Sequence, residues 1–283
     1  MSNDSFSVRQ MTRKEMDTAV DWAAKEGWNP GLHDAELFYS WDSAGFFSAV
    51  DAQDNPLGFI SAVAYGSSYG FVGFFVVKPE LRGQRIGVEL GRAALARLGG
   101  RNIGIDGVLN KVKNYQAFGF RMAHKNSRYM GINAEPPRPA YAQDIAAAPL
   151  AALLDYDTHC FSEQRHNFIK SWIAQPESAG AALLRGGKIC GYGIARKCRE
   201  GFKIGPLFAD DVRAAEEILD SLLAKLPRQA RYFLDVPETN STATALAQTR
   251  GMTPVFSTAR MYSKQPPQIP AEKIFAITSF ELG

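Results

Sequence analysis

The chain has 283 residues, of which 46% are hydrophobic and 22% charged, a composition typical of a folded protein and unlike that of disordered or collagen-like chains. Its 32 basic and 29 acidic side chains give a net charge of +3, a balance that argues against an obligate nucleic-acid binder. The length predicts about two domains of roughly 150 residues each. The three cysteines form no CxxC pair, so we expect neither a disulfide framework nor a metal site.

Targeting and partner signals are weak along the whole chain. The first twelve residues are polar, and no run approaches the roughly 20 apolar residues that a membrane span needs. There is also no basic cluster with interleaved aromatic residues, the pattern typical of single-strand nucleic-acid binding. We therefore expect a cytoplasmic protein with no membrane and no nucleic-acid partner.

The first half of the chain alternates between strand and helix patterns. Strand patterns cover residues 6–10, 46–51, 57–65, 69–77, 103–108 and 121–131. Helical spacing covers residues 14–25, a short stretch from Asp34, and residues 85–98 and 112–118. Turn-forming residues separate the strands at 46–51, 57–65 and 69–77, so we expect these three to be antiparallel.

A proline-rich connector at residues 135–139 separates this half from a second one with a similar order of elements. Three prolines in four residues cannot continue a helix or a strand. The second half shows helical spacing at 150–155, 164–173, 212–226 and 241–250, and strand patterns at 181–185, 189–197, 202–208, 232–236 and 255–262. We therefore predict a tandem duplication with domains at 1–135 and 140–283. The predicted class is α/β (α+β mixed sheet), with each domain a central mixed β-sheet flanked by helices.

The most informative stretch is residues 74–87, in which a strand runs into a tight turn that opens a helix. Free backbone N–H groups and the helix dipole form an anion site at such a helix N-terminus. Gly83 and Gly87 allow close approach of a diphosphate, and Arg82 and Arg85 add positive charge. The spacing does not match a nucleotide-hydrolysing P-loop. The alternative is an ordinary strand-to-helix turn with surface arginines.

This stretch resembles the acyl-CoA loop of the GNAT superfamily of N-acetyltransferases, Val-x-Pro-x-x-Arg-Gly-x-Gly-x-Gly, beginning at Val77 and with Arg85 in place of the middle glycine. Downstream, Asn110 and the run from Tyr115 to Gly119-Phe120 resemble the Asn…Tyr-x-x-x-Gly-Phe element of the same superfamily. The resemblance implies direct attack of a neutral amine on acetyl-CoA, with the Tyr115 hydroxyl protonating the departing thiolate. The alternative for Tyr115 is a packed aromatic residue on a short helix.

The resemblance also implies which residues bind acetyl-CoA. Backbone groups of the strand at residues 75–77 would hold the pantetheine arm, and one of their N–H groups would face the thioester oxygen. The expected acetyl-CoA contacts are Phe75, Val76, Val77, Arg82, Gly83, Gln84, Arg85, Ile86, Gly87 and Asn110.

The acceptor side of the site is less well marked in the sequence. In GNAT folds the loop between the first two helices borders the acceptor, which makes Trp28 and Asn29 candidate pocket residues and Asp34, like its neighbour His33, a candidate base or contact. The alternative is that residues 29–31 are simply a turn. No general base can be assigned from the sequence, and His124 is interpreted as structural.

The second half resembles a GNAT domain that has lost its functional residues. Its equivalent turn, residues 209–213, has two carboxylates and no glycine, and Ala247 takes the place of Tyr115. Asp210 or Asp211 is predicted to cap the following helix. The arrangement resembles a bacterial subgroup in which an active GNAT domain precedes a degenerate one that would close over the acceptor cleft. Asp235 and Glu238 would then meet a cationic amine, or serve only as a strand-end cap and a turn residue.

The predicted function is an acetyl-CoA-dependent N-acetyltransferase that acts on a primary amine of a small molecule. The alternatives are protein or peptide N-acetylation and a non-catalytic acyl-CoA-binding or sensing module. The sequence leaves the choice between monomer and homodimer open.

Overall fold

The computed structural model describes residues 6–134, 141–161 and 163–283, and the predicted proline-rich connector at 135–139 lies outside these ranges. The strands are β1 (Ser7–Gln10), β2 (Phe46–Val50), β3 (Pro56–Tyr65), β4 (Tyr69–Val77), β5 (Asn102–Val108), β6 (Arg121–Ile132), β7 (Gln143–Asp144), β8 (Ser178–Arg185), β9 (Lys188–Lys197), β10 (Phe202–Ala209), β11 (Arg231–Pro237), β12 (Thr253–Tyr262) and β13 (Ile274–Ala276). The helices are α1 (Arg13–Lys25), α2 (Asp34–Trp41), α3 (Ile86–Arg97), α4 (Val112–Ala117), α5 (Leu150–Phe161), α6 (His166–Ala174), α7 (Val212–Lys225) and α8 (Ser241–Thr249).

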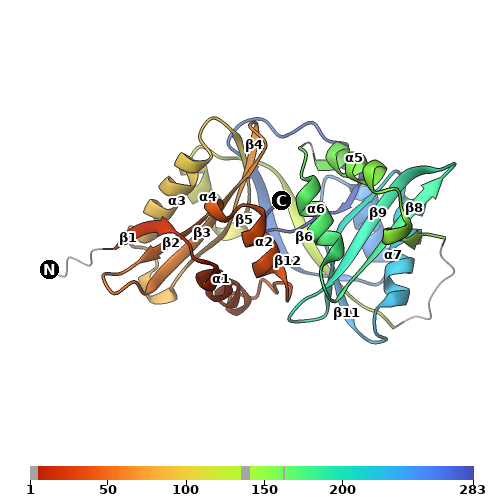
Figure 1. The fold of residues 1–283 in the computed structure, drawn as a ribbon, viewed down its shortest axis with the longest axis horizontal. Helices are drawn as coiled ribbons and strands as arrows, with labels where there is room; N and C mark the ends of the chain where they lie inside the picture. Colours follow the sequence, from red (N-terminus) through yellow and green to blue (C-terminus); the bar gives the residue numbers. More distant parts are fainter. Residues whose placement is uncertain (1–5, 135–140, 162) are drawn as a thin grey trace.

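The described strands form one continuous sheet that runs through both halves of the molecule (Figure 1). The strand order is β1-β2-β3-β4-β5-β12-β6-β11-β10-β9-β8-β7, with β13 paired to β10. One strand of each half therefore lies beside strands of the other half: β12 of the second half pairs with β5, and β6 of the first half pairs with β11. The two halves are joined by this strand exchange as well as by the connector.

Helices cover both faces of the sheet. One face packs against α1, α2, α5 and α6 in a core that is shared by the two halves, in which the Phe38 and Trp172 rings stack 5.9 Å apart. The opposite face has two separate cores, one beneath α3 and one beneath α7 and α8. We refer to these as the α1/α2 face and the α3/α4 face. Large apolar side chains at helical or alternating spacing point to each face, which is why the elements form where they do.

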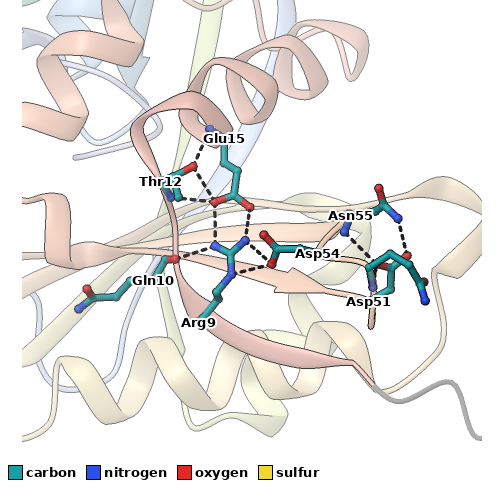
Figure 2. Close-up of polar contacts among 8 residues, drawn as sticks. Arg9, Gln10, Thr12, Glu15, Asp51, Asp54 and Asn55 are labelled. Atoms are coloured by element: carbon teal, nitrogen blue, oxygen red, sulfur yellow. Dashed lines mark hydrogen bonds and ion pairs between the residues drawn. The ribbon is translucent and has the colours of Figure 1, made fainter.

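A helix cap and two ion pairs fix the N-terminal elements of the fold. Thr12 and Glu15 form a capping box at the N-terminus of α1, which satisfies backbone N–H groups that the helix leaves free. Figure 2 shows Arg9 of β1 between the carboxylates of Glu15 and Asp54, at 2.9 and 2.7 Å. This network ties β1, α1 and the β2–β3 hairpin together.

The predicted fold class is confirmed, and every predicted helix and strand is present. The largest difference is α5, expected to end at residue 155, which runs to Phe161 because the polar Asp157 that interrupts its apolar pattern is buried against Arg165. The strands β7 and β13 were not expected. Cys160, Cys190 and Cys198 are buried and unpaired, as the absence of a cysteine pattern predicted.

Candidate active site

The strands β4 and β5 pair in parallel at one end only. Their described ladder runs from Tyr69 to Val72 and ends with Val72 opposite Ile105. Just beyond it, β4 has a β-bulge, in which it contains one residue more than the paired stretch of β3. Phe74 in this bulge adopts a φ of 45°, which is rare for a residue with a side chain. In residues 73–77 of β4, the backbone N–H and C=O groups on the β5 side therefore have no ladder partner in β5, and they border an opening between the two strands. We call this opening the β4–β5 gap.

The helix α3 begins beside the end of β4, and no side chain among the described residues caps it. Gly83, which precedes it, has a φ of 81° and open space where a side chain would start. Arg82 donates to the carbonyl of Val77 and forms an ion pair with Glu26, whereas Arg85 is 81% exposed beside Glu89. The sequence pattern thus produces an exposed helix N-terminus with free amides, the geometry that binds anionic groups.

Residues of this turn lie next to the gap. The Phe75 ring covers Gly87, where a Cβ would approach it to 3.3 Å. Phe75 is 36% exposed, and Phe118 of the loop after α4 lies over Gly91 of the same helix. Asn110 is exposed on the turn between β5 and α4. The predicted acetyl-CoA contacts therefore lie at the end of β4, at the start of α3 and on the turn after β5.

Tyr115 reaches the gap from the α3/α4 face. Its ring packs on Gly107 of β5 so closely that a Cβ at that position would overlap it. Burial raises the pKa of Tyr115, and the backbone of Val108, which lies next to its hydroxyl, opposes that rise in part. The hydroxyl thus stays protonated at neutral pH, as a general acid requires.

The second half has the same opening, but a strand of the protein fills it. The parallel ladder of β10 and β11 covers only residues 202–204 and 232–234. Beyond it, β13 pairs with β10 at Leu207 and Phe208, and the N–H of Ile277 donates to the carbonyl of Asp235 at 2.9 Å. An extended chain therefore occupies this second gap and hydrogen-bonds to both of its walls.

The other predicted losses in the second half are also visible. The side chain of Asp211 accepts a hydrogen bond from the backbone N–H of Ala214 and caps α7, as predicted. Ala247 is fully buried in α8. The turn before α7 is therefore capped by its own carboxylate, where the turn before α3 is open.

The predicted acceptor residues of the first half lie at the junction of the halves. The Asn29 side chain donates to the carbonyl of Glu200 and accepts from its N–H, both at 2.8 Å. Asp34 is fully buried and forms an ion pair with Arg196. The carbonyl of Trp28 accepts a hydrogen bond from Arg128. These contacts show that the loop between α1 and α2 docks the second half.

The predicted acceptor residues of the second half differ in environment. Asp235 is buried and receives two hydrogen bonds from Arg128, at 2.6 and 2.8 Å. Glu238 is exposed and accepts a hydrogen bond from Ser127. His33 lies 3.4 Å from Glu177 at the surface, on the far side of the docking loop.

Sequence reasoning missed a second ion pair that matches the first. Asp106 of β5 receives two hydrogen bonds from Arg260 of β12, at 3.0 and 2.6 Å. Asp106 and Asp235 hold equivalent places on β5 and β11, and each binds an arginine on the exchanged strand of the opposite half. Comparing the two repeats position by position would have found both aspartates, because each follows an apolar run of the same length.

Other functional groups are few. No set of three or more His, Cys, Asp or Glu side chains within the described ranges is placed to hold a metal ion. Among the helices that the structure describes, none has the length and apolar character to span a membrane. Burial and the nearby Arg260 lower the pKa of His124 to about 4, so this side chain is neutral at physiological pH.

A splayed pair of parallel strands occurs in both halves, and in the first half an uncapped helix and a buried tyrosine lie beside it, an arrangement that indicates the acyltransferase class. Two family models agree: the acetyltransferase (GNAT) family matches residues 11–120, and the acetyltransferase (GNAT) domain matches residues 153–276. Together they span most of the chain, which belongs to the GNAT superfamily, an acyltransferase family that conventionally uses acyl-CoA.

Individual relatives cover the whole chain. The holothin acyltransferase of Pseudoalteromonas sp. (strain SANK 73390) is 28% identical over 282 residues, which are 99% of this chain and 96% of that protein. A Pyrococcus horikoshii structure assigned as an acetyltransferase superposes with a TM-score of 0.83 at 21% identity, over 100% of this chain and 98% of that one. A tandem GNAT protein from the clavulanic acid biosynthesis pathway gives a TM-score of 0.63 at 12% identity, over 93% and 100% of the two chains. The tandem architecture is thus shared with solved structures.

Proposed function

We propose that this protein is an N-acetyltransferase that transfers the acetyl group of acetyl-CoA to a primary amine of a small molecule. The first half, residues 1–135, would bind acetyl-CoA and perform the transfer. The second half, residues 140–283, would bind no acyl-CoA and would complete the acceptor side of the site. The name of the holothin acyltransferase, a relative of nearly the same length, supports a small-molecule acceptor.

The observation that carries this proposal is the contrast between the two gaps. The gap of the second half holds β13, which shows that an opening of this shape binds an extended chain through the backbone of β10. The equivalent backbone groups in the first half belong to Phe75 and Val76 and lie beside the uncapped end of α3. A pantetheine arm is an extended chain with amide groups, and its diphosphate would lie at the N–H groups of residues 83–87.

The chemistry follows from the groups at the gap. The amine nitrogen attacks the thioester carbon, a backbone N–H of residues 75–77 stabilises the developing oxyanion, and the hydroxyl of Tyr115 protonates the departing thiolate. One preorganised donor at an oxyanion typically contributes about 2.7–4 kcal/mol of transition-state stabilisation. Asn110, exposed on the turn after β5, is proposed as a further acetyl-CoA contact.

The acceptor would lie on the α1/α2 face of the gap, near the docking loop. Trp28 and Glu238 are proposed to line its path, because Trp28 is only partly buried and Glu238 is exposed. The carboxylates of Asp34 and Asp235 and the side chain of Asn29 already have protein partners, which supports a docking role for these three residues.

The first test is calorimetric titration of the protein with acetyl-CoA. We expect one site per chain, and we expect binding to be lost in the double variant Arg82→Glu with Gly83→Pro, which adds repulsion and removes a backbone donor at the anion-binding turn. The matched control is Arg213→Glu, on the exposed first turn of α7, which should leave binding unchanged. Absence of binding in the folded wild type would contradict the proposed function. Binding without acetylation of any amine would instead favour an acyl-CoA sensor.

A further inference from the structure

The chain that follows β13 lies where the two halves meet. We call residues 277–283 the C-terminal segment; they lie in the middle of the molecule (Figure 1), and all of them are buried. The hydroxyl of Thr278 accepts a hydrogen bond from Arg165 at 2.8 Å, and the carbonyl of Leu282 accepts one from the hydroxyl of Tyr65, also at 2.8 Å. Arg165 belongs to the second half and Tyr65 to the first, so the segment is bound to both.

The two halves place a glycine at the same point of their gaps. Gly73 is the first β4 residue beyond the parallel ladder with β5, and Gly205 is the first β10 residue beyond the parallel ladder with β11. Each also lies at a register shift relative to the antiparallel neighbour of its strand. Counting on from the two glycines, β4 residues 75–76 correspond to β10 residues 207–208.

In the second gap, the chain that fills it passes over this glycine. β13 pairs with β10 at Leu207 and Phe208. The next two residues of the filling chain, Ile277 and Thr278, cover Gly205, where a Cβ would overlap the carbonyl oxygen of Ile277 and lie 2.9 Å from that of Thr278. An extended chain that starts beside α7 and follows the free backbone of β10 therefore leaves the gap over the glycine.

In the first gap, the place over the glycine is taken by the backbone of Glu281. A Cβ on Gly73 would overlap the carbonyl oxygen of Glu281 and lie 3.1 Å from its Cα. An acyl-CoA that starts beside α3 and follows β4 residues 75–76 in the same way would direct the acyl end of its thioester toward this backbone. The C-terminal segment thus stands across the path that a longer acyl chain would take.

Buried contacts fix the C-terminal segment in this place. The hydroxyl of Ser279 accepts a hydrogen bond from the backbone N–H of Leu282 at 3.0 Å, and its carbonyl accepts one from the N–H of Gly283 at 3.2 Å. The turn that these bonds close contains Glu281, whose side chain is buried in an ion pair with Lys203 of β10 at 3.8 Å. The backbone of Glu281 cannot move aside without breaking buried polar contacts, which costs free energy.

We propose that the C-terminal segment limits the length of the acyl chain that this protein accepts, with the Glu281 backbone as the end wall of the acyl site. The site would take an acetyl group and reject a chain of four carbons. The inference rests on the proposed transfer from acyl-CoA and adds the acyl specificity, which no sequence motif indicates. In an enclosed site, one methylene group changes selectivity by roughly 10–200-fold.

The test compares the dissociation constants of acetyl-CoA and butyryl-CoA by calorimetry, which requires no acceptor. We expect the wild type to bind butyryl-CoA at least about tenfold more weakly. Leu282→Ala removes a buried side chain next to the wall and should bring the two constants within about threefold of each other. The matched control is Leu153→Ala in α5, which truncates an equally buried leucine of the same core and should keep the wild-type ratio.

Tyr65→Phe is a second variant, for the case that Leu282→Ala does not fold. It removes only the hydrogen bond to the Leu282 carbonyl and should shift the ratio in the same direction. Equal affinity of the wild type for the two thioesters would overturn the inference and leave the proposed function standing. A wild-type ratio in every folded variant of Leu282 and Tyr65, or an equal change in Leu153→Ala, would also overturn it. If the wild type binds neither thioester, the proposed function fails, and the acyl wall fails with it.

Discussion

Tyr115 combines a fixed position with a protonated hydroxyl. Because Gly107 has no side chain, the Tyr115 ring packs directly on the β5 backbone and is fixed there. Burial raises the pKa of its hydroxyl. Both properties come from packing, and neither requires a charged neighbour. A residue with this environment suits a thiolate leaving group, which needs a proton only as the C–S bond breaks.

Replacing Tyr115 by Phe removes the acid and keeps the ring. We expect acetyl-CoA affinity to stay the same, since the ring still packs on Gly107, and turnover to fall at least tenfold, within the roughly 10²–10⁴-fold range of general acid catalysis. Steady-state kinetics with calorimetric binding as the control would check this. Unchanged turnover over the full pH range would remove Tyr115 from the mechanism.

At the scale of single elements, the chain from β13 to residue 283 explains features of both gaps. β13 blocks the gap of the second half, and the C-terminal segment that follows it, residues 277–283, contacts β4 at Gly73 in the first half. One segment thus closes one potential acyl-CoA site and shapes the other. Contact with β4 depends on a glycine, because the carbonyl of Glu281 occupies the place of a side chain at Gly73.

The variant Gly73→Ala should displace the C-terminal segment. Forcing a methyl group into a packed contact typically costs about 1–3 kcal/mol, and we expect a loss of that order in urea unfolding. Limited proteolysis should show faster cleavage within residues 277–283. Gly99→Ala, where a Cβ would have only an ordinary contact at 3.4 Å, is the matched control. Equal stability and equal protection of the two variants would contradict the close contact at Gly73.

At the scale of the whole molecule, the strand exchange makes the two halves interdependent. β5 has β12 as its neighbour, and β11 has β6, so each half needs a strand of the other to complete its sheet. The buried pairs Asp106–Arg260 and Asp235–Arg128 connect the same strands across the exchange. Removing one partner of a buried ion pair leaves an uncompensated charge, which typically costs about 3–5 kcal/mol.

We therefore expect that neither half folds alone. A fragment of residues 1–134 would expose the edge of β5 and leave Asp106 buried without Arg260, and a fragment of residues 141–283 would leave Arg260 without Asp106. Circular dichroism and size-exclusion chromatography should show unfolded or aggregated fragments, and coexpression of both should restore a one-to-one complex. Cooperative unfolding of either fragment near the temperature of the intact protein would contradict this expectation.

Much of this protein could be read from its sequence, because the relevant signals are local. The periods of apolar residues predicted the helices and strands, and the glycine and arginine spacing at residues 82–87 and the run at Tyr115 predicted the acyltransferase family. The loss of glycine and tyrosine in the second half was equally visible, and the capping role of Asp211 followed from its place before a helix.

What the tertiary structure alone decided is how distant segments pair. The exchange of β6 and β12 leaves no local trace, since an exchanged strand has the same alternation as one that stays in its own half. The same holds for the pairing of Asp34 with Arg196 and of Asp235 with Arg128, which gave these carboxylates partners that no spacing indicates. The position of Glu281 at Gly73 likewise depends on a contact across about two hundred residues, and such contacts are set by the packing of the whole chain.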